Sequence, residues 1–114
     1  MEIKIIKRKI SQSELQAIAK LNYGEMVKGV ADIARKIVAL GGELHADAES
    51  VLLDDGSKQK DLWGFNIYPN KAREQRLEYT SFINIRPVDK NTSLEIKDEG
   101  LRRKVRDVVD HVIE

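Results

Sequence analysis

Hydrophobic and charged residues alternate at the beginning of the chain. Met1, Ile3 and Ile5 fall on one face of an extended backbone, whereas the charged residues between them fall on the other. Successive side chains of a strand point to opposite faces, so this two-residue period predicts a short strand over residues 1–6.

A helical pattern follows this strand. Ser11 and Glu14 have the spacing of a capping box, in which each side chain accepts a hydrogen bond from the other residue's backbone N–H. Apolar residues then recur at helical spacing, at Leu15, Ile18 and Ala19. We expect a helix that begins after Ser11 and ends near Gly24, because glycine is a common C-terminal stop.

Residues 26–40 support two interpretations. Their apolar positions match a helical period, but many of these residues are β-branched, which favours strands. In the second interpretation Arg35 and Lys36 form the turn of a hairpin. The residues alone leave both structures open.

Two further strands are predicted in the second half of the chain. Residues 62–68 alternate, with Trp63, Phe65 and Ile67 on one face. Residues 77–86 alternate as well, and Pro87 ends that strand because proline lacks a backbone donor. We expect the two strands to pair as an antiparallel hairpin with a long loop.

The last element is a helix that Asp98 can cap. Its apolar residues have the spacing of an amphipathic helix that lies on a sheet: Leu101, Val105, Val108, Val109, Val112 and Ile113. The pattern predicts an α+β fold, a mainly antiparallel sheet with an N-terminal helix and a C-terminal amphipathic helix. We expect residues 1–114 to form a single domain, since no linker or repeat divides them.

The most informative stretch for chemistry is residues 41–49. Four ionisable residues occupy alternate positions there: Glu43, His45, Asp47 and Glu49. On a strand all four would share one face; on a helix only His45 and Glu49 would stack, four residues apart. The choice between strand and helix therefore decides whether a cluster exists.

Two kinds of site fit this cluster. Carboxylates with one imidazole suit a divalent metal, so Glu43, His45, Asp47 and Glu49 are candidate metal ligands. His45 could instead be a general base beside Glu43 and Asp47, which makes these three the candidate catalytic residues. The competing interpretation is structural: a solvated strand face, or acids in the first turn of a helix that complement its dipole.

A polar face on the predicted hairpin is the third candidate. Asn66 and Asn84 lie opposite the apolar faces of their strands, and Arg86 could hold a carboxylate or phosphate with two hydrogen bonds. These three are candidate ligand-binding residues for a small molecule of unknown identity. A solvent-facing sheet would show the same alternation, and Arg86 could simply pair with the acids of residues 43–49.

The amino-acid composition limits the chemistry and the binding partners that are expected for this protein. There is no cysteine, which excludes disulfides and thiol chemistry, and the formal net charge is +1. The charge balance and the small number of aromatic residues argue against a nucleic-acid partner. The longest apolar runs are too short for a membrane span, and the N-terminus lacks a signal peptide, so we expect a cytoplasmic protein without a membrane partner.

Several short motifs resemble those of a small prokaryotic family of unknown function. They are Gly-Gly-Glu-Leu-His-Ala-Asp-Ala-Glu at 41–49, Gly-Ser-Lys-Gln at 56–59, Trp-Gly at 63–64 and Ile-Asn-Ile-Arg-Pro at 83–87. The resemblance covers essentially the whole chain and implies a cytosolic domain without an established activity, substrate or cofactor. It also favours the hairpin for residues 26–40. The family often has a cysteine where this chain has Ala48, so thiol chemistry is not needed here.

Two hypotheses of function follow. In the first, the protein is a small enzyme or a ligand- or metal-binding protein whose site contains Glu43, His45, Asp47 and Glu49, assisted by Asn84 and Arg86. In the second, it is a non-catalytic interaction module, such as a homodimer, in which these residues are structural. A net charge close to zero favours self-association, which supports the second hypothesis.

Overall fold

The computed structural model describes residues 2–114. Within these residues the chain forms five strands: β1 (Lys4–Ile6), β2 (Val27–Asp32), β3 (Ile37–Leu40), β4 (Leu62–Ile67) and β5 (Leu77–Glu78). The α-helices are α1 (Gln12–Lys20), α2 (His45–Asp54) and α3 (Glu99–Val112). Three short 3-10 turns complete the list: η1 (Gln59–Asp61), η2 (Phe82–Asn84) and η3 (Pro87–Asp89).

The strands form one sheet in the order β1-β3-β2-β4-β5, and every neighbouring pair is antiparallel. Its centre is the pairing of β2 with β4, which runs from Val27 opposite Ile67 to Asp32 opposite Leu62. The predicted α+β fold with an antiparallel sheet and a C-terminal helix is confirmed.

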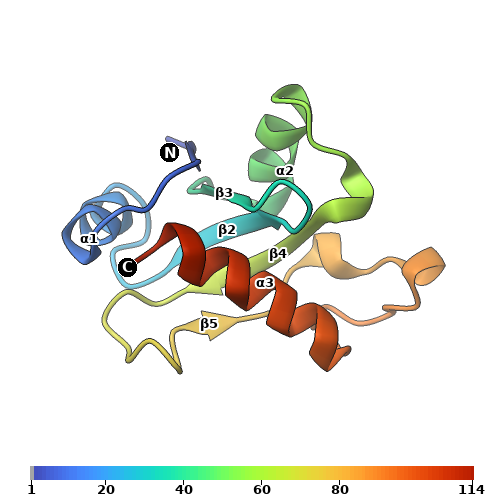
Figure 1. Cartoon of the computed structure of the whole chain (residues 1–114). Coiled ribbons are helices and arrows are strands. Elements are labelled where there is room, and N and C mark those ends of the chain that lie inside the picture. Colours follow the sequence, from blue (N-terminus) through green and yellow to red (C-terminus); the bar gives the residue numbers. More distant parts are fainter. Residues whose placement is uncertain (1) are drawn as a thin grey trace.

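Helices cover both faces of the sheet. Helix α3 lies across the face turned to the viewer in Figure 1, and α2 lies behind the sheet. Two groups of buried side chains correspond to these layers. The larger group contains Val105, Val109 and Val112 of α3 against Phe65 of the sheet, and the smaller contains Ala48 and Leu52 of α2. Burying these apolar side chains is what holds the layers together.

The first helix shows how local signals place an element. Ser11 and Glu14 form the predicted capping box: each side chain accepts the other's backbone N–H at 3.1 Å. The helix ends at Lys20, earlier than the sequence indicated. Gly24 closes the end instead, because its φ of 82° lets its N–H reach the carbonyl of Ala19 at 2.7 Å.

Residues 26–40 form the hairpin of β2 and β3. The buried carboxylate of Asp32 accepts hydrogen bonds from the backbone of Ala34 at 2.9 Å and Arg35 at 2.8 Å, which shapes the turn. Lys36 completes it with a φ of 59°, a left-handed conformation that L residues seldom adopt. The helical interpretation of this stretch is therefore wrong.

The predicted strand over residues 77–86 is largely wrong. The expected antiparallel pairing with β4 is present, but β5 ends at Glu78 and the chain then turns through η2 and η3. Asn84 gives the physical reason. Its side chain, not its backbone, pairs with the backbone of β4, so the segment cannot continue as a regular strand.

The predicted strand near the start of the chain and the predicted helix at its end are both present, as β1 and α3. Strand β1 begins at Lys4, and Met1 lies outside the described residues. Asp98 caps α3 by accepting the N–H of Leu101 at 2.9 Å, as its position before the helix indicated. No helix within residues 2–114 is long and apolar enough to cross a membrane.

Candidate functional site

Residues 43–49 enter a helix, so the four ionisable side chains do not share one face. Gly41 and Gly42, with φ of 114° and 94°, turn the chain from β3 into α2, which begins at His45. Glu43 and Asp47 are exposed to solvent, whereas His45 and Glu49 are partly buried one helical turn apart. The alternative in which this stretch is a strand is wrong.

His45 is bound to the sheet below it. Its Nε2 lies 2.8 Å from the carbonyl oxygen of Phe65, which requires the proton on Nε2 and leaves Nδ1 as an acceptor. Burial lowers the pKa of His45, and the positive charge of Lys28 lowers it further, while the bond to Phe65 opposes both. The neutral imidazole is therefore favoured. No hydrogen bond joins His45 to Glu43 or Asp47 within residues 2–114.

Glu49 faces a different environment one turn along α2. Burial raises the pKa of its carboxyl group, and the charge of Arg86 and a hydrogen bond from Gln59 act in the opposite direction. No ion pair or hydrogen bond joins Glu49 to Arg86 within residues 2–114, so the two side chains interact only through their charges. Pairing of Arg86 with an acid of residues 43–49 stays a prediction.

Arg86 is held tightly by the protein. Its guanidinium lies 3.6 Å from the centre of the Trp63 ring and donates to the carbonyls of Gln59 at 2.6 Å and Lys60 at 3.4 Å. Its Nε lies 3.2 Å from a carboxylate oxygen of Asp89. The guanidinium therefore ties η1 to η3. It borders an open cavity of about 340 Å³ that also contacts Val88.

Asn84 is fully buried and its amide is used by the backbone. The side-chain oxygen accepts the N–H of Gly64 at 2.8 Å, and the side-chain nitrogen donates to the carbonyl of the same residue at 3.0 Å. Asn84 Nδ2 also lies 3.3 Å from the carbonyl of Leu94. The amide thus takes the place of a neighbouring strand at Gly64.

Comparison with known proteins places this chain in a family. The family model described as protein of unknown function (DUF5674) matches residues 4–112. The chain belongs to this family. This agrees with the resemblance to an uncharacterised family of small domains. No curated protein and no solved structure matches the chain.

The remaining ligand-binding candidate of this DUF5674 protein is Asn66. Its Nδ2 donates to a carboxylate oxygen of Glu78 at 2.8 Å, and the same oxygen accepts the hydroxyl of Tyr68 at 3.3 Å. The side-chain oxygen of Asn66 is buried and has no hydrogen-bond partner among the described residues. Burial is the largest effect on the pKa of His45 and lowers it, and the side chain of Asn66 acts in the opposite direction.

The structure therefore divides the predicted residues into pairs. Glu49 is affected by the charge of Arg86 and His45 by the side chain of Asn66, whereas Glu43 and Asp47 are exposed to solvent. Residues 2–114 contain no group of three or more His, Asp or Glu side chains placed to hold a metal ion. Binding of a divalent metal stays a prediction.

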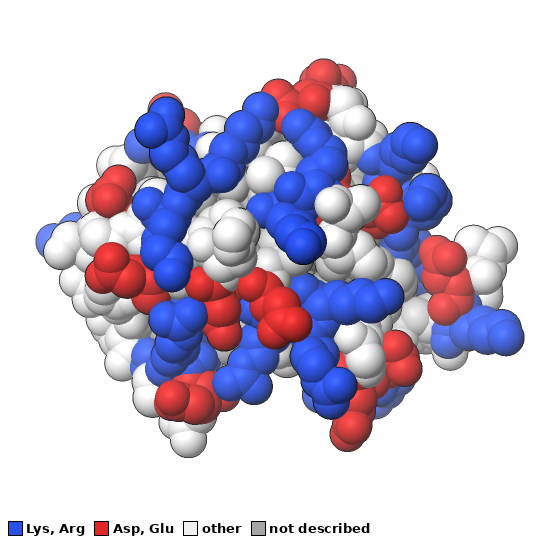
Figure 2. Space-filling model, in the orientation of Figure 1, with Lys and Arg blue, Asp and Glu red and all other residues white. Residues whose placement is uncertain are grey.

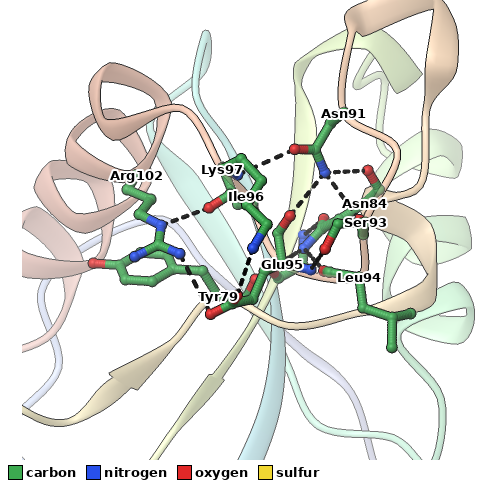
Figure 3. A network of polar contacts seen from close by, with 10 residues as sticks. Tyr79, Asn84, Asn91, Ser93, Leu94, Glu95, Ile96, Lys97 and Arg102 are labelled. Carbon is green, nitrogen blue, oxygen red and sulfur yellow. Dashed lines mark hydrogen bonds and ion pairs between the residues drawn. The ribbon is translucent and has the colours of Figure 1, made fainter.

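Two residues outside the predicted set, Trp63 and Asn91, contact the candidate residues directly. Trp63 carries Arg86 on its ring, and Asn91 donates from its amide to the carbonyls of Asn84 at 2.8 Å and Glu95 at 3.0 Å. Figure 3 shows Asn91 between these two segments. Only its position in a loop rich in polar residues hinted at this role, because asparagine commonly caps turns.

Proposed function

We propose that this protein is a non-catalytic interaction module that self-associates through an apolar loop surface, defined as Phe82, Ile85 and Val88. One observation carries the proposal: these three side chains are 81%, 42% and 91% exposed. Isolated exposed apolar residues are common, but three within seven positions of one loop make this loop a candidate for a protein contact.

The residues between Phe82, Ile85 and Val88 hold this loop in a fixed shape. Asn84 is bound to β4 and Arg86 lies on Trp63, so polar side chains point inward while the apolar ones point outward. The backbone of Arg86 adds hydrogen bonds with Asn91 at 2.7 and 3.2 Å. A surface that is already ordered loses little conformational entropy on binding, which favours association.

Charge supports a second copy of the chain as the partner. The net charge of +1 gives little long-range repulsion between copies. Beside Val88, exposed Asp89 and Lys90 carry opposite charges. A symmetric dimer needs a self-complementary surface, and adjacent side chains of opposite charge are compatible with one.

Sedimentation velocity over a range of concentrations tests this proposal. We expect Phe82→Ser and Val88→Ser each to weaken self-association on the order of tenfold, since each removes much of an apolar side chain from the contact. Leu21→Ser is the matched control, because Leu21 is 60% exposed at the end of α1. A wild-type protein that remains monomeric at high concentration, or equal weakening by Leu21→Ser, would contradict the proposal.

A second candidate function depends on His45 and Glu49 of α2. His45 and Glu49 lie one turn apart on the same flank of α2, and burial lowers the pKa of His45 and raises that of Glu49, so both shifts favour the uncharged side chain. Such a pair is suited to acid–base chemistry or to supplying two ligands to a divalent metal. In this alternative the protein is a small enzyme or a ligand-binding protein, and Glu43 and Asp47 have only supporting roles.

Thermal unfolding with added Mn²⁺ or Zn²⁺ tests the metal form of this alternative, because a ligand that binds only the folded protein raises its melting temperature. We expect the shift to disappear in His45→Gln and Glu49→Gln. The exposed residues supply the controls, Glu43→Gln and Asp47→Asn, which should keep it. Absence of any shift in the wild-type protein would count against a metal site.

A further inference from the structure

A cluster of three arginine side chains lies outside the site described above, at the beginning of α3. A cavity of about 300 Å³ opens there between the helix and the chain after β5. It is lined by Tyr79, Glu99, Arg102, Arg103 and Arg106. Figure 2 shows that Lys and Arg side chains cover much of the face on which α3 lies, with acidic side chains between them.

The three arginines come together because of their spacing on one helix. Arg102 and Arg106 are four residues apart, and Arg103 and Arg106 are three apart, so all three project over adjacent turns of α3. The cavity lining thus contains three guanidinium groups and one carboxylate, that of Glu99.

Arg102 is fixed in place. Its Nε donates to the carbonyl of Ile96 at 2.5 Å, and its guanidinium lies 5.3 Å from the centre of the Tyr79 ring. An Nη2 contact of 3.4 Å to Glu95 completes its surroundings. Figure 3 shows the guanidinium over the ring of Tyr79 and the links to Ile96 and Glu95. This group provides a rigid wall for the cavity.

Arg103 and Arg106 retain most of their hydrogen-bonding capacity. Arg103 is exposed and forms no ion pair within residues 2–114, and Arg106 reaches Asp110 only at 3.9 Å. The hydroxyl of Tyr79 has no hydrogen-bond partner among the described residues either. Burial raises the pKa of this hydroxyl above its usual value of 10.0, so it remains a donor at neutral pH.

We propose that this cavity, the arginine pocket (Tyr79, Arg102, Arg103 and Arg106), binds a small phosphate-bearing ligand. Guanidinium groups bind phosphate oxygens with paired hydrogen bonds, and several of them around one cavity match the charge of a phosphate better than that of a single carboxylate. The pocket shares no residue with the apolar loop surface of Phe82, Ile85 and Val88, so this proposal does not rest on the self-association described above.

Inorganic phosphate and pyrophosphate are the probes for a titration followed by NMR of the wild-type protein. We expect shifts of the backbone amides around residues 99–106, with pyrophosphate binding more tightly than phosphate. The double variant R103Q/R106Q should weaken binding by about tenfold or more, since it removes two charged donors. Both side chains are exposed, so the fold should be retained, which circular dichroism checks.

Arg8→Gln is the control for loss of an arginine away from the pocket, because Arg8 is exposed in the loop before α1. It should leave binding unchanged. The proposal is overturned if neither probe shifts the amides of α3, if sodium chloride at matched ionic strength gives the same shifts, or if R8Q weakens binding as much as R103Q/R106Q.

Discussion

Individual polar side chains fix the segment after β5, which contains η2 and η3, to the rest of the protein. Asn84 replaces a strand neighbour at Gly64, and Arg86 lies on Trp63 while it binds the carbonyls of η1. Buried polar groups of this kind are costly unless they are fully paired, so their contribution is best seen when one partner is removed. Two of the predicted ligand-binding residues, Asn84 and Arg86, thus hold the backbone in place, and their binding of a ligand stays a prediction.

Asn84→Ala should therefore destabilise the protein strongly. It leaves both the N–H and the carbonyl of Gly64 buried without partners, and we expect a loss of about 3 kcal/mol in the free energy of unfolding. Urea denaturation measures this change. Asn70→Ala is the control, because Asn70 is exposed and should change stability by less than about 0.5 kcal/mol. Similar values for the two variants would show that the amide of Asn84 is dispensable.

His45 should make stability depend on pH. Its folded pKa lies below the ordinary 6.5, so at mildly acidic pH the unfolded chain binds more protons than the folded one. The stability contributed by the neutral imidazole is complete above pH 6.5 and is lost as the pH falls from that value toward the folded pKa. Urea denaturation at several pH values should show a smaller acid loss in His45→Gln, whereas the exposed His111→Gln should behave like the wild-type protein.

At the scale of helices and strands, some elements were predictable from local sequence signals, whereas others depended on contacts between distant residues. The capping box of α1 and the Asp98 cap of α3 were predictable because each involves residues three positions apart. The hairpin of β2 and β3 was ambiguous, because Val30, Ile33 and Ile37 satisfy a helical period and also favour strands. Pairing of β2 with β4 decides for strands, and that contact joins residues about 35 positions apart.

Ser11→Ala tests the local part of this argument. It removes the oxygen that accepts the N–H of Glu14, and we expect a loss of about 1 kcal/mol in the free energy of unfolding. Ser13→Ala lies on the exposed side of the same helix and should be neutral or slightly stabilising, since alanine is the best helix former. Thermal or urea unfolding of both variants makes the comparison, and a loss in Ser13→Ala as large as in Ser11→Ala would contradict it.

At the scale of the whole molecule, Arg76 joins the end of the chain to the sheet region. Its buried guanidinium donates to the carbonyls of Glu114 at 2.8 Å and Ile113 at 3.2 Å and lies 3.1 Å from the carboxylate of Asp110. The segment after β4 and the C-terminal end of α3 are thereby fixed to each other (Figure 1). Nothing in the local sequence around Arg76 indicated that this side chain would be buried.

Arg76→Met should cost about 3 kcal/mol in the free energy of unfolding, because it keeps the apolar stem but leaves the C-terminal acceptors without their donor. Arg73→Met provides the control. Arg73 contacts the same Asp110 at 3.5 Å, but its side chain is 45% exposed, and exposed ion pairs contribute little. Chemical denaturation of both variants measures the difference; equal losses would mean that burial of Arg76 adds nothing.

The sequence by itself determined the fold class, the amphipathic helix α3 and both side-chain caps, since these depend on residue spacing within one segment. It also picked out Glu49 and Arg86, whose charges interact without an ion pair within residues 2–114. Only the tertiary structure decided that residues 43–49 enter a helix and that residues 77–86 leave the sheet. Those outcomes depend on which distant groups bury each side chain, above all Phe65 for His45 and Gly64 for Asn84, and such pairings have no signature in local periodicity.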